Sequence, residues 1–395
     1  MTTTDPIVIV AAARTPMGGF LGDLKDVSAP ALGARAIFAA VERAGIAADS
    51  VDEILMGCVL PAGQGQAPAR QAAIGAGLPL AAGATTINKM CGSGMKAAMV
   101  AHDLLRAGSA DVVVAGGMES MSNAPYLLDR ARSGYRMGHG RTIDHMFLDG
   151  LEDAYDKGRL MGTFAEDCAE AYQFTRAGQD AYALTSLERA NRAIKNGDFA
   201  WEIAPVNVKA GKSETLVATD EQPPKARPDK IPTLKPAFRD GGTVTAANSS
   251  SISDGAAALV MMRESEAERR GAGPLARIVA HATHAAAPKD FPTAPIAALK
   301  KLFEKTGWSQ DSVDLFEINE AFAVVAMAAM RDLGLAHEKV NVNGGACALG
   351  HPIGASGARI LVTLIAALGA RGGKRGVASL CIGGGEATAM AIEMA

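Results

Sequence analysis

Continuous apolar runs alternate with helix-like stretches over the first part of the chain. Residues 7–13 are wholly apolar, as expected of a strand that is covered on both faces. Residues 51–57 and 111–115 are predicted as further strands, the latter ending at Gly116 and Gly117. Between the first two of these strands, residues 29–44 have helical character and stop at a glycine. This alternation predicts a layered α/β domain.

The pattern weakens after residue 118. Residues 122–149 carry scattered Arg, Gly, His and Met with little periodicity, whereas 163–172 and 176–196 regain a helical pattern. Residues 220–235 are rich in proline and basic side chains, which predicts an extended loop. We therefore expect residues 119–249 to form an insertion that lies over the core domain.

A second alternating block begins near residue 273 and is similar to the first. In the first block Gly92-Ser93-Gly94 opens a helix-like stretch, and a strand ends in a glycine pair. In the second, Gly354-Ala355-Ser356-Gly357 opens a helix-like stretch, and the strand 377–381 runs into three glycines. This internal repeat predicts duplicated halves. The expected divisions are 1–118 plus 250–272, the insertion 119–249, and 273–395.

Composition narrows the class of protein. The chain has 395 residues, a net charge of −3, 48% hydrophobic residues and five widely spaced cysteines. A net charge of −3 gives no electrostatic attraction to nucleic acid or to an anionic membrane surface. The absence of a CxxC pair argues against a zinc site. Free thiols and an N-terminus without a basic leader indicate a reducing, cytoplasmic location. The most apolar runs, 321–330 and 360–370, are short for a membrane span and predict buried helices.

Four stretches combine a polar or reactive side chain with glycine or a turn. Cys91 precedes Gly92-Ser93-Gly94 at the start of a helix, where the helix dipole favours a thiolate. Asn319 lies at a strand-to-helix junction, His351 lies between Gly350 and Pro352, and Cys381 precedes Gly383. Taken singly, each has an ordinary alternative. The cysteines could be core residues, Asn319 a helix cap, and His351 a surface turn residue.

Together the four stretches resemble the thiolase family. They are Asn-Lys-Met-Cys-Gly-Ser-Gly, Asn-Glu-Ala-Phe-Ala, Gly-His-Pro-Ile-Gly-Ala-Ser-Gly and Cys-Ile-Gly-Gly-Gly, in that order. The resemblance implies an α/β fold of duplicated, five-layered αβαβα type, with an inserted loop domain that covers the CoA site. It also implies an acetyl-CoA C-acetyltransferase that condenses two acetyl-CoA to acetoacetyl-CoA and CoA, or reverses this by thiolysis. The alternative is a broader-range 3-ketoacyl-CoA thiolase of fatty-acid β-oxidation.

The resemblance assigns a role to each reactive residue. Cys91 would be the nucleophile that carries the acetyl group, His351 its activating base, and Cys381 the acid and base at the second substrate. Asn319 and His351 would form one oxyanion hole, and the backbone at Cys91 and Gly383 the other. Two cysteines of nearly neutral pKa would suit a reversible transfer.

Further residues are implied for the substrate. Ser250 matches a serine at the pantetheine arm, Phe238 a pocket aromatic, and Met161 a methionine that limits the acyl chain. Lys225 and Arg227 are candidates for the CoA phosphates, although a solvated charge run is an equal alternative. For Met161 and Phe238 the alternative is core packing. The family's histidine before Met-Gly is Leu160 here, which leaves the acyl chain length open.

The implied partners are acetyl-CoA, acetoacetyl-CoA and CoA, all as substrates, with no further cofactor and no metal. Homo-oligomers are usual in the family, and residues 122–149 resemble the insertion of its tetrameric members, so a homotetramer is expected over a dimer. Two other functions share this scaffold. A β-ketoacyl synthase would use one cysteine and two histidines, and an acyl-CoA-binding protein would use none of these groups chemically.

Overall fold

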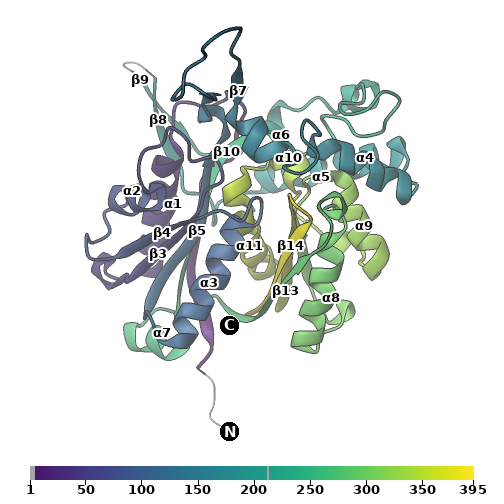
Figure 1. Cartoon of the computed structure of the whole chain (residues 1–395). Coiled ribbons are helices and arrows are strands. Elements are labelled where there is room, and N and C mark those ends of the chain that lie inside the picture. Colours follow the sequence, from purple (N-terminus) through teal and green to yellow (C-terminus); the bar gives the residue numbers. More distant parts are fainter. Residues whose placement is uncertain (1–4, 211–212) are drawn as a thin grey trace.

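The computed structural model describes residues 5–210 and 213–395, and its layers alternate helix, sheet, helix, sheet, helix (Figure 1). The strands form a mixed sheet in the order β12-β13-β14-β11-β1-β10-β5-β3-β4. The two halves of this sheet join through a short pairing of β1 with β11, at Val8 with Arg277 and Ile9 with Ala276. The expected five-layered α/β fold is confirmed.

The bounds of the strands follow. The N-terminal half contains β1 Ile7–Arg14, β3 Glu53–Gly57, β4 Gly83–Ile87, β5 Val112–Ser120 and β10 Ser253–Arg263, with the short β2 Gly18–Gly19 beside β10. The C-terminal half contains β11 Ala276–Ala285, β12 Leu315–Ile318, β13 Arg375–Ile382 and β14 Glu386–Met394.

The helices form three layers. The outer layer of the N-terminal half contains α1 Ala29–Ala44 and α2 Pro68–Gly75, with α7 Glu264–Arg270 at one end of the sheet. The central layer contains α3 Ser93–Ala107 and α11 Ile353–Arg371. The outer layer of the C-terminal half contains α8 Ala294–Thr306 and α9 Ala323–Leu333. Apolar cores fill each interface, and the central one joins Met95 and Leu105 to Ile360 and Leu364.

The duplication is visible in the strand order. In the first half β3 pairs with β4 and β5 in parallel, and β10 and β1 follow antiparallel. In the second half β12 pairs with Val340 and β13 in parallel, and β14 and β11 follow antiparallel. Each half therefore repeats one order, and α3 and α11 occupy equivalent places.

The glycine pair at 116 and 117 does not end its strand, because β5 continues to Ser120. A Cβ at Gly116 would strike the carbonyl of Ala257, and one at Gly117 the carbonyl of Gly354. The glycines therefore allow close contact with β10 and with the start of α11.

Residues 119–249 form hairpins and helices above the core (Figure 1). These are the hairpins β6 Tyr126–Leu128 with β7 Thr142–Asp144 and β8 Val206–Ala210 with β9 Ser213–Val217, and the helices α4 Met161–Ala171, α5 Arg176–Asn196 and α6 Gln222–Lys225. The expected extended loop at 220–235 is wrong, since α6 and the 3₁₀ turn Pro228–Thr233 occupy it. Proline is well tolerated in a first helical turn, where it loses no hydrogen bond. The three-part division of the chain stays a prediction.

The apolar run 360–370 belongs to α11, which spans 19 residues. Among the described residues α11 is long and apolar enough to cross a membrane, but 89% of its apolar window is buried inside the protein. It is therefore the core helix between the two sheet halves, as the apolar run predicted.

Candidate active site

Two helices bring the candidate residues to one end of the central layer. The N-termini of α3 and α11 meet through glycines, and a Cβ at Gly94 would lie 2.7 Å from the backbone nitrogen of Ala358. A Cβ at Gly357 would likewise clash with Met95. Cys91 and His351 each lie just before one of these helices. The close packing therefore places both residues at the same end of the layer.

Cys91 is half-buried beside the end of β13. Burial raises the pKa of its thiol to about 11, although hydrogen bonds from the backbone N–H groups of Gly383 and of Cys91 itself lower it. The expectation of a nearly neutral pKa is therefore wrong for Cys91, because desolvation outweighs the helix terminus. The two N–H groups therefore point toward the Cys91 sulfur.

His351 is held by a serine of the following helix. Its Nδ1 lies 2.5 Å from Ser356 Oγ, and that hydroxyl donates to the carbonyl of Pro352 at 2.9 Å. The Ser356 oxygen therefore accepts from Nδ1–H, which leaves Nε2 as the unprotonated nitrogen. Nε2 is buried and has no hydrogen-bond partner among the described residues. Burial, aided by Arg359, lowers the pKa of His351 to about 3, so the imidazole is neutral.

Cys381 and Asn319 lie at the carboxyl ends of the neighbouring strands β13 and β12. Burial, with the adjacent Cys91 as a further cause, raises the pKa of the Cys381 thiol well above its usual value. Asn319 is anchored through its backbone N–H to Ser379, whereas both polar atoms of its side chain are buried without a partner in the described chain. Such unpaired buried groups are costly and indicate a binding role.

The segment Ser250–Ser251 is hydrogen-bonded through its backbone to two parts of the candidate site. The backbone N–H of Ser250 donates to Ala321 at 2.9 Å, and that of His351 donates to Ser251 at 3.2 Å. The segment therefore lies between the turn that follows Asn319 and the His351 turn.

The insertion contributes two apolar side chains. Met161 Sδ would lie 3.6 Å from a Cβ at Gly383, so this thioether forms a wall near the end of β13. Phe238 packs against Gly162 and stands edge-on to Phe322, with ring centroids 5.9 Å apart. Met161 therefore lies beside the end of β13, and Phe238 packs against the start of α4.

A cavity of about 350 Å³ lies between the insertion and the C-terminal half. Lys225, Arg227 and Lys230 line it together with Ser251 and Cys347, whereas Ser250 does not. Lys225 is 60% exposed and forms ion pairs with Glu221 and Asp23. The lining therefore combines three basic side chains with mostly apolar ones.

Reasoning from the sequence missed three supporting residues. Ser356 lay within a quoted motif, so its place five positions after His351 was a usable signal. The buried carboxylate of Glu119 accepts from the N–H groups of Val59, Leu60 and Gly354, and burial raises its pKa to about 7.

The third is Glu320, which accepts from Tyr182, Ser186 and Asn341 and from the N–H of Cys347. Burial, with Glu320 next, raises the pKa of the Cys347 thiol well above its usual value. This favours Cys347 as a packing residue over a third catalytic thiol beside Cys91 and Cys381.

The repeated α/β halves, with a cysteine and a histidine before equivalent central helices, define a class of two-domain α/β enzymes. The family models for the thiolase N-terminal domain and the thiolase C-terminal domain match residues 7–265 and 272–394. The chain belongs to the thiolase family.

Relatives match over nearly their full length. Acetyl-CoA acetyltransferase 2 of Arabidopsis thaliana is 52% identical, over 98% of this chain and 97% of that protein. Acetyl-CoA acetyltransferase of Pseudomonas aeruginosa is 48% identical, over 98% of both. The crystal structure of the Bacillus anthracis acetyl-CoA acetyltransferase superposes with a TM-score of 0.97 at 42% identity, over 100% of both chains.

Proposed function

We propose that the chain is an acetyl-CoA C-acetyltransferase, which condenses two acetyl-CoA into acetoacetyl-CoA and CoA and also runs the reverse thiolysis. The observation that carries the proposal is the convergence of Cys91, Cys381 and the Gly383 N–H at the end of β13. Full-length relatives named as acetyl-CoA acetyltransferases support it.

In the first half of the cycle the Cys91 sulfur attacks the carbonyl carbon of acetyl-CoA. Its proton moves to Nε2 of His351, the nitrogen that the Ser356 contact leaves free. The C–S bond to CoA breaks, and the departing thiolate takes the proton of Cys381. The products are acetyl-Cys91, free CoA, an imidazolium at His351 and a thiolate at Cys381.

In the second half the Cys381 thiolate removes a methyl proton from a second acetyl-CoA. The resulting carbanion attacks the acetyl carbonyl on Cys91, and the Cys91 thiolate leaves and recovers its proton from His351. In both halves of the cycle, hydrogen-bond donors must stabilise the negative charge that develops on the thioester oxygen. Asn319, through its unpaired buried amide, and the Gly383 N–H would supply them.

Trapping the intermediate tests the assignment of the nucleophile. After incubation with acetyl-CoA alone, mass spectrometry of proteolytic fragments should find one acetyl group, on Cys91, and initial-rate kinetics should be ping-pong. An acetyl group on Cys381, or none on Cys91 in enzyme that condenses acetyl-CoA, would refute the assignment.

A short acyl group is favoured by the Met161 thioether near Gly383. Met161→Ala should raise kcat/KM for thiolysis of longer 3-ketoacyl-CoAs, by roughly 10- to 200-fold per accommodated methylene. The measurement is thiolysis kinetics over increasing chain length, with the half-buried Met327→Ala on α9 as control. Equal efficiency of the unmodified protein on all lengths would instead favour the broader-range thiolase.

The proposal extends to a homotetramer in a reducing, cytoplasmic compartment. Its support is the exposure of large apolar side chains in the segment 126–148, namely Tyr126, Leu128, Met137, Phe147 and Leu148, and the presence of five free cysteines. Light scattering coupled to size exclusion tests the assembly, and a monomer at micromolar concentration would contradict it.

A further inference from the structure

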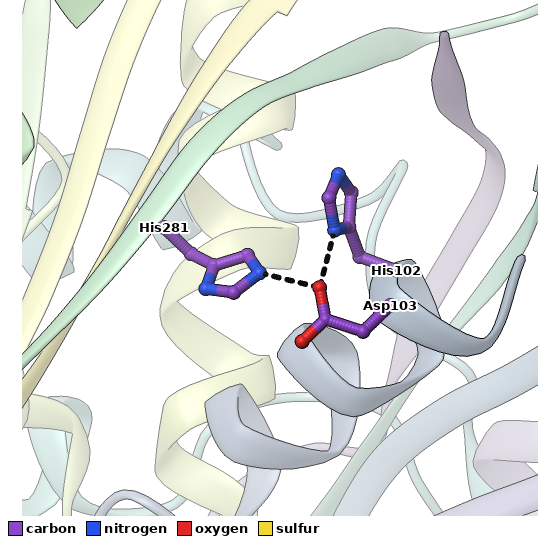
Figure 2. Close-up of side chains that lie close together, drawn as sticks. All are labelled: His102, Asp103 and His281. Atoms are coloured by element: carbon purple, nitrogen blue, oxygen red, sulfur yellow. Dashed lines mark hydrogen bonds and ion pairs between the residues drawn. The ribbon is translucent and has the colours of Figure 1, made fainter. Parts of the chain in front are cut away.

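A second cluster of potential ligands lies away from the candidate active site. His102 and Asp103 on α3 face His281 on β11 (Figure 2). The Asp103 Oδ1 atom lies 3.0 Å from His102 Nδ1 and 3.0 Å from His281 Nε2. One ligand atom from each residue lies within 4.8 Å of the others. Three donors thus converge from two halves of the fold.

We propose that His102, Asp103 and His281 form a binding site for a first-row transition-metal ion of the Zn²⁺ type. Two imidazole nitrogens and one carboxylate oxygen are a donor set that such ions prefer, whereas Mg²⁺ and Ca²⁺ favour oxygen alone. Three protein ligands leave a fourth position for water.

The geometry needs only a small adjustment. Tetrahedral ligands at about 2.0–2.1 Å from a zinc ion lie about 3.3 Å from one another. The two nitrogen-to-oxygen separations of 3.0 Å would open slightly, and the nitrogens would close from within 4.8 Å. The His102 and His281 side chains are 10% and 18% exposed, whereas the Asp103 side chain is 60% exposed. An ion would therefore reach the two imidazole rings from the side of the Asp103 carboxylate.

The cluster lies far from Cys91, so an ion bound there would take no part in the acyl transfer. His102 lies about 14 Å along α3 from the first residue of that helix, which follows Cys91. A bound ion would join the central helix of the N-terminal half to the first strand of the C-terminal half. Because it binds only the folded state, it would raise the unfolding temperature with its concentration.

The competing explanation is a hydrogen-bonded triad, in which both rings donate to Asp103 and stand edge to face at 5.0 Å. Asp103→Asn separates the two, because an asparagine oxygen still accepts hydrogen bonds but is a poor zinc ligand. His281→Gln removes a nitrogen ligand. His284→Gln, on the same strand, is the matched control.

The test titrates the intact protein with Zn²⁺, followed by calorimetry, and with Co²⁺, followed by its visible absorption. The expected result is one equivalent bound, cobalt bands without a thiolate charge-transfer band, and a higher unfolding temperature in Zn²⁺. Both Asp103→Asn and His281→Gln should weaken binding by more than the roughly 10- to 100-fold that loss of an outer-shell partner causes. His284→Gln should bind normally.

Two results would overturn the proposal. One is unchanged affinity in Asp103→Asn and His281→Gln. The other is no binding to the unmodified protein apart from a thiolate-type cobalt spectrum, which would leave the triad as hydrogen bonding alone. Circular dichroism checks that each variant is folded.

Discussion

Ser356→Ala should slow acyl transfer by releasing His351 from a fixed orientation. The Ser356 hydroxyl is buried, accepts from His351 Nδ1 at 2.5 Å and donates to Pro352 at 2.9 Å. Without it, no other described residue provides a hydrogen bond to Nδ1. The neutral imidazole can then carry its proton on Nε2 instead of Nδ1, and an Nε2 that is already protonated cannot act as the base.

The magnitude follows from the loss of one buried hydrogen bond. Leaving a buried donor unpaired costs about 1–3 kcal/mol. If the proposed transition state depends on that contact, the same energy corresponds to a fall in kcat of roughly 5- to 150-fold. KM for acetyl-CoA should change little, because Ser356 does not line the cavity. Rapid quench with mass spectrometry measures the rate of acetyl-Cys91 formation directly.

Thr363→Val is the matched control on the same helix. Its buried hydroxyl donates to Glu202 at 2.8 Å and belongs to a different network. It should lose a similar stability in urea unfolding, yet keep the acetylation rate within about twofold, since no contact with His351 is broken. A folded Ser356→Ala enzyme that acetylates Cys91 at the normal rate would refute the reasoning.

Cys381→Ser should lower condensation by about 10²- to 10⁴-fold while Cys91 still becomes acetylated, because carbanion formation has no other base, whereas water can protonate the departing CoA thiolate. Equal loss of both steps would contradict its role. The pKa of His351 falls to about 3 on folding, so the unfolded chain binds more protons between pH 3 and 6.5 and stability drops as the pH falls through this window. Relative to His351→Asn, the unmodified protein should lose about 1.4 kcal/mol of unfolding free energy between pH 7.5 and 5.5, measured in urea, and a pH-independent difference would exclude a neutral buried histidine. Lys225→Ala and Arg227→Ala should each raise KM for acetyl-CoA by about two- to fivefold. KM for acetyl-N-acetylcysteamine, a thioester without the phosphates, should not change. Equal effects on KM for both thioesters would argue against phosphate contacts.

Much of the fold follows from local sequence patterns. The apolar run at 7–13 becomes β1 with every residue buried, and the helix expected at Ala29–Ala44 has those bounds. Such features depend on near neighbours in the chain, which a periodicity captures. The motifs also indicated the thiolase family correctly, because they place polar or reactive groups in a fixed order and three of the four combine such a group with glycine.

The wrong prediction at 220–235 is local, since short helical turns form there, but the others depend on contacts between distant segments. Gly117 lies inside β5, and glycine is needed there because the start of α11, far along the chain, approaches its backbone. The high pKa of Cys91 results from burial in the assembled layer, whereas the local sequence indicates only the position of Cys91 at a helix terminus. The grouping of His102 with His281 depends on how the two halves pack.

The two thiol pKa values suggest why the proposed cycle needs its order. In the resting protein burial, with Cys91 as a further cause, raises the pKa of Cys381, because a charge on one sulfur disfavours a charge on the other. With both pKa values raised, both thiols are protonated in the resting protein, so this repulsion prevents the two thiolates from forming together. The Cys381 thiolate is easier to form once the Cys91 proton has moved to His351, because the positive imidazolium favours a nearby negative charge. Premature deprotonation of acetyl-CoA is thus disfavoured until an acceptor is bound to Cys91.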